Sequence, residues 1–288
     1  CDRIIFANPC KLPSHIVHAA GQGVHLTTFD SESELHKLYK LNPLAEVVLR
    51  IRACDPGARS PLGGKYGAEM EECERLLIVA KSLGLHVVGV AFHVGSGASD
   101  SASFASGIYQ ARQVFDMAKS HGIASLRLLD IGGGFVSDGG LGVSFQSAAS
   151  SINEALEKYF PSSMGVSVIA EPGRFFAEEA FTLATQVFGS RVRRGNSGEL
   201  VEYWINDGIY GSMNCLLYDH AILSVRPLCI SSSLDIDDKE EDACEKARST
   251  IFGPTCDSLD TIMEGVLLPR MTCGDWLVFP RMGAYTKA

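Results

Sequence analysis

Three consecutive glycines stand where the anionic group of a ligand could bind. Gly132, Gly133 and Gly134 follow the apolar run 126–131. Such a run lets the backbone approach a ligand closely and point several N–H groups at one anion. A tight turn between a strand and a helix would need the same glycines, so this segment alone leaves both interpretations open.

A second glycine-rich segment contains a histidine. The sequence His93-Val94-Gly95-Ser96-Gly97 follows the apolar run 87–92. Its glycines again allow close approach, and the Ser96 hydroxyl could bind phosphate. A lone histidine is more often structural, but the position of His93 beside a Gly-Ser-Gly turn at the end of a predicted strand favours a functional role.

A glutamate and an arginine follow a third apolar run, 166–170, in the sequence Glu171-Pro172-Gly173-Arg174. A carboxylate at the end of a buried strand is costly unless it is paired. One interpretation is a structural salt bridge between Glu171 and Arg174. In the other, Glu171 keeps a cofactor ring nitrogen protonated and Arg174 helps to bind the cofactor's phosphate.

Two acidic sites lie in the second half of the chain, in Tyr218-Asp219-His220 and in Cys256-Asp257. Two carboxylates could share a cationic substrate amine, and Cys256 could donate a proton or act as a nucleophile. Taken singly, each pattern is more typical of a structural role.

The elements that must position these residues alternate in type. Predicted strands cover 4–7, 24–28, 47–51, 87–92, 126–131 and 166–170, and amphipathic helices include 72–83, 104–118 and 152–159. The sequence Asp30-Ser31-Glu32 is a good helix start. Repeated strand–helix units predict an α/β fold with a parallel sheet, either doubly wound or a barrel, whose active site lies at the carboxyl ends of the strands. A barrel needs eight strands, so two would be missing.

The character of the sequence changes after about residue 181. Predicted strands at 200–205, 221–225 and 276–279 are separated by glycine, proline and polar clusters, with no long amphipathic helix. We therefore expect a partial α/β barrel over 1–180 and a partial β-rich domain over 181–288. The polar, acidic stretch 231–248 is typical of a solvated loop.

Composition restricts the partners and the compartment. The 288 residues are 46% hydrophobic, enough for a sizeable core, and the net charge of -9 disfavours nucleic acid or an anionic membrane as main partner. No apolar run approaches the roughly 20 residues of a membrane span. Nine cysteines, odd in number and irregularly spaced, predict neither a disulfide framework nor a metal site and favour a reducing, cytoplasmic setting.

The motifs together resemble a known family. ANPCK at 7–11, HVGSG at 93–97, DIGGGF at 130–135, AEPGR at 170–174, NDGIYGSMNCLLYDH at 206–220, GPTCDSLD at 253–260, GDW at 274–276 and MGAYT at 282–286 closely resemble, in order and over essentially the whole chain, the eukaryotic ornithine decarboxylases. The resemblance implies an alanine-racemase-like barrel followed by a β domain. It also implies a pyridoxal 5'-phosphate cofactor and a head-to-tail homodimer with active sites at the interface.

Roles follow residue by residue from this resemblance. His93 is expected to stack on the pyridoxal ring and Glu171 to bond its nitrogen. The phosphate is expected to be held by Ser96, Gly132, Gly133, Gly134, Arg174 and Tyr285.

The resemblance also assigns substrate and interface residues. Tyr218 and Asp219 of one subunit and Asp257 of the other are expected to bind ornithine, the two carboxylates at its terminal amine, and Cys256 to protonate the α-carbon after CO2 leaves. Lys65, Tyr210 and Asp260 are expected at the dimer interface, where Lys65 and Asp260 match residues that pair between the two subunits.

One departure from the family concerns a lysine. The lysine that forms the cofactor Schiff base in this family follows the first barrel strand in a Tyr-Ala-Val-Lys-like context, which does not occur here. Lys11 follows a strand that matches the third, and Lys65 matches an interface residue. The missing lysine and the two missing strands have one explanation, an internal fragment, which we expect to be inactive and prone to aggregate by itself.

The resemblance therefore implies decarboxylation of L-ornithine to putrescine and CO2, a step of polyamine synthesis. The main alternative is a decarboxylase-like regulator that binds a partner protein. Such a protein should lose the cofactor and substrate groups, which are present here. A relative acting on lysine, arginine or diaminopimelate is a second alternative, although His220 favours ornithine. A phosphate-binding isomerase on a plain barrel would not explain the β domain or the Cys256-Asp257 pair.

Overall fold

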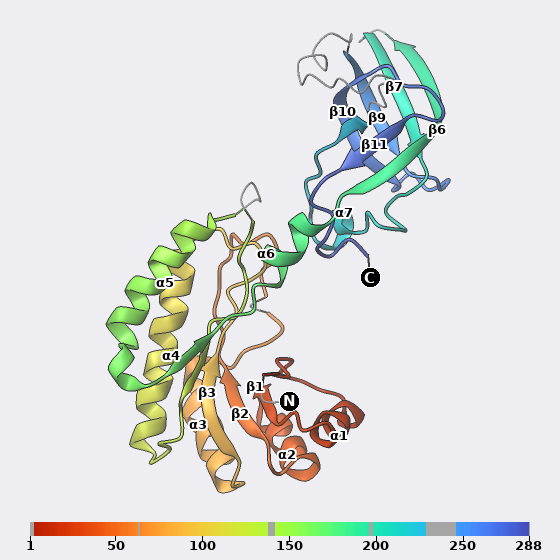
Figure 1. The fold of residues 1–288 in the computed structure, drawn as a ribbon. Coiled ribbons are helices and arrows are strands. Elements are labelled where there is room, and N and C mark those ends of the chain that lie inside the picture. Colours follow the sequence, from red (N-terminus) through yellow and green to blue (C-terminus); the bar gives the residue numbers. More distant parts are fainter. Residues whose placement is uncertain (1–2, 63, 138–141, 196–197, 229–245, 288) are drawn as a thin grey trace. The chain divides into compact units, whose positions relative to one another are not determined.

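The chain forms two compact units that divide between Arg174 and Phe175 (Figure 1). The structure is a computed structural model and describes residues 3–62, 64–137, 142–195, 198–228 and 246–287. Most of the polar stretch expected as a loop, 231–248, lies outside these residues.

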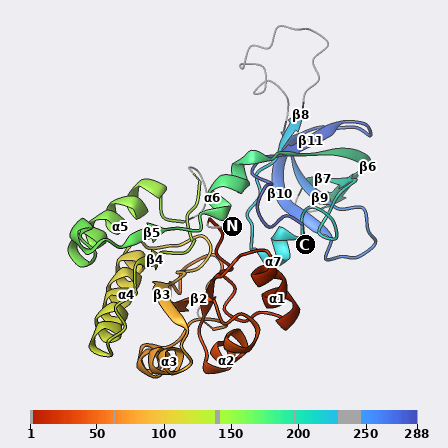
Figure 2. The same cartoon turned by 60° about the horizontal axis from the view of Figure 1, so that its bottom comes forward.

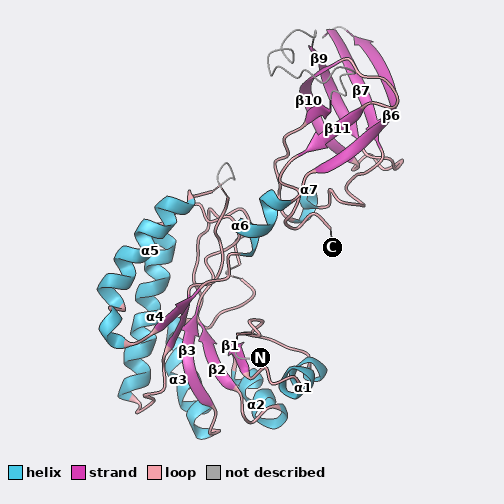
Figure 3. Ribbon diagram, viewed as in Figure 1, coloured by secondary structure: helices cyan, strands magenta, loops and turns pink. Residues whose placement is uncertain are grey.

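The first unit is built on a parallel sheet of five strands in chain order: β1 Leu26–Phe29, β2 Glu46–Arg50, β3 His86–Ala91, β4 Leu128–Asp130 and β5 Ser167–Ile169 (Figure 3). Strands buried on both faces are apolar along their whole length. The central strands follow this pattern, since all of β3 except its first residue is buried.

One helix precedes the first strand and four connect successive strands, and they lie side by side along one face of the sheet in Figure 2. They are α1 Pro13–Gly21, α2 Glu32–Leu41, α3 Met70–Ser82, α4 Ala102–Ser120 and α5 Phe145–Tyr159. The predicted start of α2 is confirmed, since the Ser31 hydroxyl accepts a hydrogen bond from the Glu34 N–H at 3.4 Å. Helix α4 turns Phe104, Ile108 and Ala111 into the core.

The predicted alternation of strands and helices is confirmed, with one correction. The run 4–7 was expected to be a full strand but forms a single bridge, in which the Phe6 N–H donates to the Leu26 carbonyl at 2.9 Å. Pro9 follows two residues after Ala7 and has no N–H with which to extend the ladder. Phe6 therefore only borders β1.

The second unit is a mixed sheet of six strands in the order β10-β9-β7-β6-β11-β8. The strands are β6 Leu183–Gly195, β7 Gly198–Ile205, β8 Arg226–Leu228, β9 Lys246–Phe252, β10 Thr261–Pro269 and β11 Trp276–Phe279. Two short helices, α6 Gly173–Ala177 and α7 Cys215–Tyr218, complete the described elements of this region together with brief 3-10 turns. The core contains Tyr203 and Phe279, both fully buried.

The strand predicted at 221–225 is wrong. Ala221, Leu223 and Val225 alternate as in a strand and pack against the core, but this segment has no ladder partner among the described residues, and β8 begins only at Arg226. Alternating burial therefore arises here without strand pairing. No helix in the described part of the chain is long and apolar enough to cross a membrane.

Candidate functional site

The loops that follow β3 and β4 meet in a glycine-lined cradle. A Cβ added to Gly133 would stand 2.7 Å from the His93 Nε2 atom, and one on Gly132 would stand 2.1 Å from the Phe92 carbonyl oxygen. A Cβ added to Gly134 would stand 2.7 Å from the Gly95 carbonyl oxygen. Gly132 and Gly134 also have positive φ, at 64° and 112°. These positions require glycine for both space and backbone conformation.

A buried guanidinium stands beside this cradle. Arg174 is 5% exposed, and its Nε and Nη2 atoms donate to the Ser96 hydroxyl at 3.0 and 2.9 Å. A fixed positive charge next to a hydroxyl is a donor set suited to phosphate. Two residues predicted to bind phosphate are thus in direct contact.

The loop that carries Ser96 is paired with the loop that follows β2. Ser96 and Ser60 exchange two backbone hydrogen bonds of 3.0 Å, and the Arg59 N–H donates to the Gly97 carbonyl at 3.0 Å. The Ala98 N–H donates to the Gly134 carbonyl at 3.0 Å. The two glycine-rich segments identified in the sequence are therefore joined directly.

His93 is held as a neutral ring. The Gly95 N–H donates to its Nδ1 at 3.0 Å, so the ring carries its proton on Nε2. Burial, together with the positive charge of Arg50, lowers the pKa of His93 to about 4. A neutral, fixed imidazole is suited to stacking on an aromatic ligand and unsuited to binding phosphate by charge.

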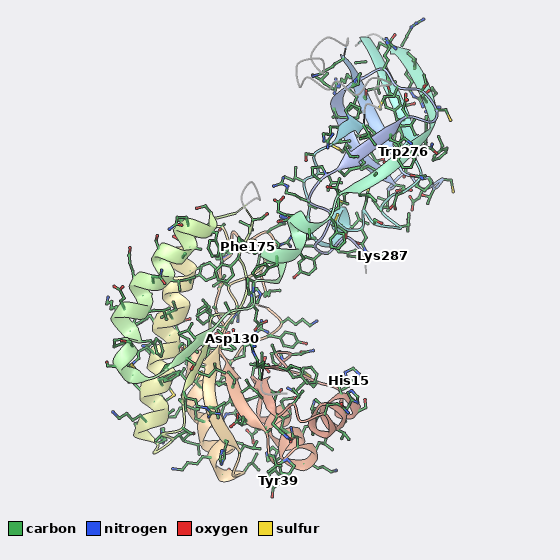
Figure 4. All side chains as sticks on the ribbon, in the orientation of Figure 1. His15, Tyr39, Asp130, Phe175, Trp276 and Lys287 are labelled. Carbon is green, nitrogen blue, oxygen red and sulfur yellow. The ribbon has the colours of Figure 1, made fainter. Side chains whose placement is uncertain are left out.

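Two carboxyl groups lie at the ends of adjacent strands. Asp130, labelled in Figure 4, ends β4, and its Oδ1 accepts a hydrogen bond from the Gly132 N–H at 2.9 Å. The Glu171 N–H donates to the Gly132 carbonyl at 2.8 Å. Complete burial, followed by the negative charge of Glu171, raises the pKa of Asp130 to about 8, against the opposing charge of Arg50. With Asp130 protonated, the Glu171 carboxylate can pair with a cationic group of a ligand.

The expectation that Glu171 ends a buried strand is wrong. Glu171 is exposed, and Val168 in β5 is 40% exposed. The reason is that β5 lies at the edge of the sheet and pairs, within the described residues, only with β4. The carboxylate of Glu171 is thus open to a ligand.

Arg50 and Asp130 were not among the residues predicted for the site. Each is the last residue of its strand, and each is a charged residue at the end of an apolar run. That pattern could have identified them, because the carboxyl ends of parallel strands meet at one edge of the sheet. The Arg50 guanidinium also stands over the Tyr66 ring, 5.6 Å from its centroid.

The chemistry of the residues around the cradle fits pyridoxal phosphate. The glycines leave no room for a side chain, Arg174 and Ser96 supply donors for a phosphate, and a carboxylate and a neutral imidazole flank the same loops. Within the described residues, no group of three or more His, Cys, Asp or Glu could hold a metal ion.

The lysines named in the sequence have other surroundings. Lys11 is buried, and its Nζ pairs with the Glu34 carboxylate at 2.9 Å and donates to the Thr28 carbonyl at 2.7 Å. Burial lowers the pKa of Lys11, although Glu34 opposes the shift. Lys65 is exposed, with its Nζ 5.3 Å from the Tyr66 ring centroid.

In the second unit, Cys256 and Asp257 lie exposed on the turn between β9 and β10. The Tyr210 hydroxyl donates to the Asp257 carboxylate. This bond lowers the pKa of Asp257 and raises that of Tyr210. The sequence placed Asp257 with the substrate and Tyr210 at an interface, and the structure brings the two into contact.

Asp260 organises that turn from inside. It is 1% exposed, and its carboxylate accepts hydrogen bonds from the Ile209 N–H at 3.0 Å, the Thr255 N–H at 3.0 Å and the Thr255 hydroxyl at 2.7 Å. Its pairing with Lys65 of another copy stays a prediction.

The remaining predicted residues are placed separately. Asp219 is buried at the end of α7, and Tyr218 before it is 77% exposed. Tyr285 is 60% exposed. His220 and Tyr285 have φ of 51° and 56°, in the left-handed region that non-glycine residues seldom adopt. Such strain is typical of functional positions.

A cavity of about 240 Å³ adjoins the Cys256 turn within the second unit. Arg191 and Arg193 line it and pair with the Glu202 carboxylate at 2.5 and 2.8 Å. Trp204 and Phe252 form its apolar wall, with their rings stacked 5.4 Å apart. The exposed thiol therefore borders a cavity with both charged and aromatic walls.

Comparison with known proteins identifies the same family in both units. Residues 1–178 match the model of the pyridoxal-dependent decarboxylase family, pyridoxal binding domain. The structure superposes on the arginine decarboxylase of Paramecium bursaria Chlorella virus, bound to agmatine, with a TM-score of 0.88 and 39% identity, covering 99% of this chain and 73% of that one.

Curated relatives match along the entire chain. The chloroplastic ornithine decarboxylase of Nicotiana glauca is 50% identical, and the ornithine decarboxylase of Mus musculus is 45% identical. Each match covers 100% of this chain, and 64% and 62% of the respective relative. The chain thus spans less than two thirds of the length of these relatives.

Proposed function

The chain belongs to the family of pyridoxal-dependent decarboxylases, and we propose that the protein removes the carboxyl group of L-ornithine to give putrescine and CO2. The observation that supports this best is the contact of the Gly132–Gly134 cradle with His93, beside the Ser96–Arg174 pair. The identities to ornithine decarboxylases exceed the identity to the viral arginine decarboxylase. His220, next to Asp219, agrees with this substrate.

The cofactor-binding roles divide by chemistry. Ser96, Arg174 and the glycine run Gly132–Gly134 hold the phosphate, together with Tyr285. The Gly132 N–H donates to Asp130, so Gly132 contributes close approach, and Gly133 and Gly134 contribute the N–H donors. His93 lies against the ring as a neutral imidazole, in keeping with its lowered pKa. When bound, pyridoxal phosphate accepts the electrons that departing CO2 leaves on the α-carbon.

Glu171 stabilises the protonated ring nitrogen, since a carboxylate partner favours the positive charge. Asp130, which holds a proton near neutral pH because of burial and of Glu171 itself, adds no second negative charge. The protonated ring nitrogen is therefore paired with a single carboxylate, that of Glu171.

The substrate-binding roles belong to the second unit. Asp219 and Asp257 bind the terminal amine of ornithine, and Tyr218 lines the substrate site. Because acidic groups at the far end of the site would be left unpaired by an apolar side chain, they select a diamino acid. The Cys256 thiol gives its proton to the α-carbon after CO2 leaves.

Assembly and location are part of the proposal. We infer a head-to-tail homodimer in which Asp219 and Asp257 of one site come from different copies, with Lys65, Tyr210 and Asp260 at the interface. We place the protein in the cytoplasm. The relative from Nicotiana glauca is named chloroplastic, so cell fractionation of the tagged full-length protein would separate the two compartments.

The experiment measures putrescine released from ornithine by the full-length protein with pyridoxal phosphate, with lysine and arginine in parallel. We expect ornithine to be preferred, and Cys256→Ala and Glu171→Ala to lower kcat by at least about a hundredfold. Cys273→Ala is the matched control, since Cys273 is an exposed thiol of the same unit on another turn.

The competing function is a decarboxylase-like regulator without catalysis. Retention of Glu171, Arg174, Asp219, Cys256 and Asp257 opposes it. A soluble dimer that forms no product from any diamino acid would support the regulator. Faster turnover of lysine or arginine would assign the substrate differently within the same chemistry.

A further inference from the structure

A buried carboxylate outside the site described so far, Asp55, binds the loop between β3 and α4, which carries His93 and Ser96. Asp55 lies in the loop that follows β2 and is 4% exposed. Its two oxygens accept four hydrogen bonds. The donors are the Gly57 N–H at 3.0 Å, the Ser99 N–H at 2.6 Å, the Ser99 hydroxyl at 2.7 Å and the Asp100 N–H at 3.3 Å.

Three of these bonds join segments that are far apart in sequence. Asp55 and Ser99 are separated by 44 positions, and Ser99 lies in the same loop as His93, between β3 and α4. The two backbone hydrogen bonds between Ser60 and Ser96 join the same two loops a second time. Ser96 is also the residue that binds Arg174. The Ser96 hydroxyl is therefore fixed on one side by Arg174 and on the other by the loop that Asp55 anchors.

The two loops around Asp55 are packed too closely for a side chain to be added at Gly57 or Gly95. A Cβ on Gly57 would stand 2.4 Å from the Ser99 Oγ, and a Cβ on Gly95 would stand 2.9 Å from the Ala58 Cβ. The loop after β2 and the loop after β3 thus touch at backbone level. A change in either loop displaces the other.

The charge of Asp55 is satisfied by its partners. Burial acts to raise the pKa of Asp55, but the hydrogen bonds from Ser99, Asp100 and Gly57 outweigh it and hold the pKa below its ordinary value. A carboxylate with four donors has no need of a cation. It would repel a phosphate rather than bind one, so any effect on the phosphate must pass through the loop.

We propose that Asp55 is a positioning residue for the cofactor phosphate, acting by fixing the loop between β3 and α4 so that the Ser96 hydroxyl faces the phosphate beside Arg174. The inference rests on the proposed cofactor site and adds a residue that does not contact the cofactor. A residue that acts only on the phosphate should leave the rest of the cofactor's binding energy unchanged.

The test compares pyridoxal phosphate with pyridoxal, which lacks the phosphate. Dissociation constants of both are measured on full-length, cofactor-free protein by absorbance titration, with inorganic phosphate as competitor. For Asp55→Asn, which keeps the shape but loses at least two acceptor positions, we expect the affinity for pyridoxal phosphate and for inorganic phosphate to fall roughly tenfold. The affinity for pyridoxal should stay within about twofold.

Ser99→Ala is the milder variant and removes only the hydroxyl bond, so its loss should be smaller, about two- to fivefold. At saturating cofactor, kcat and the KM for ornithine should be close to wild type in both variants. Glu34→Gln is the matched control. It removes a buried charge that pairs with Lys11 and Lys37 in the same unit, away from this loop. It should lower the melting temperature without altering the ratio of the two affinities.

The proposal is overturned if Asp55→Asn and Ser99→Ala weaken both ligands equally, or weaken neither while lowering stability as Glu34→Gln does. A wild-type protein that binds pyridoxal phosphate but forms no putrescine would refute the proposed reaction and leave this test valid. A wild-type protein that binds neither ligand would refute the cofactor site itself, and with it this proposal.

Discussion

At the scale of single residues, the site depends on which groups are charged. His93 is kept neutral and Asp130 protonated by the same two causes, burial and the charge of a neighbour. Arg50 is near both, and it lowers the pKa of His93 while opposing the rise at Asp130. The strand ends therefore form one electrostatic unit, in which changing one charge shifts the others.

Asp130 gives a prediction for stability against pH. In the unfolded chain its pKa is about 3.9, and in the folded protein it is raised to about 8. Between these values the folded state holds a proton that the unfolded state has lost, so stability decreases as pH rises. In Asp130→Asn the group stays neutral, and the Asn oxygen can still accept from the Gly132 N–H.

We therefore expect the melting temperature of Asp130→Asn, relative to wild type, to increase between about pH 5 and pH 8.5. The measurement is calorimetry of the full-length, cofactor-free proteins. A difference that does not change over this range would show that Asp130 is ionised in the folded state.

At the scale of elements, the turn between β9 and β10 depends on Asp260. Asp260→Ala leaves the buried N–H groups of Ile209 and Thr255 without their acceptor, which should cost about 1–3 kcal/mol of stability. The same turn carries Cys256, so kcat should fall more than the KM for ornithine rises.

Asp275→Ala is the comparison, because Asp275 accepts from the Thr272 N–H and hydroxyl on a different turn of the same unit. Denaturant unfolding and steady-state kinetics measure both effects. Equal losses of kcat in the two variants would contradict a special role for the turn that carries Cys256.

Elements with strong local patterns could be predicted from the sequence. The strands of the first unit are short apolar runs, and α2 begins at a residue that caps it. The glycines, His93 and Arg174 could be selected as candidate site residues for the same reason, since each stands next to such a run. The alternation of apolar residues at 221–225 led to a wrong strand prediction, because side chains can pack against the core without a ladder partner.

Contacts between distant segments could not be predicted from pattern. Nothing near Asp55 indicates that its partners lie 44 positions away. The exposure of Glu171 depends on β5 being an edge strand, which is a property of strand order. The burial of Asp260 depends in the same way on the turn that contains Ile209.

At the scale of the whole molecule, residues 1–288 produced alone should self-associate. Among the described residues, the parallel sheet has β5 at an edge, and Val168 and Ile4 expose apolar side chains near its two sides. Exposed edges and apolar surface favour association. Sedimentation would test this, and a soluble monomer with cooperative unfolding would contradict it.

The proposed dimer makes a second prediction at this scale. If Asp219 and Asp257 of one site come from different copies, each of the two single alanine variants should be nearly inactive alone. Mixed dimers of Asp219→Ala and Asp257→Ala would hold one intact site, so random mixing should restore about a quarter of wild-type activity. Co-expression with two affinity tags measures this. No recovery in isolated mixed dimers would place both carboxylates in one copy.

The crowding around Gly132, Gly133 and Gly134 also affects how the protein can evolve. Every missense change in these codons adds at least a Cβ, and at each position that atom would stand less than 3.0 Å from a backbone or side-chain atom. No graded series of substitutions therefore leads away from this loop. Drift and engineering can alter the acidic groups and aromatic walls of the second unit step by step. If the second unit binds the substrate as proposed, new substrates are more accessible to mutation than a new cofactor.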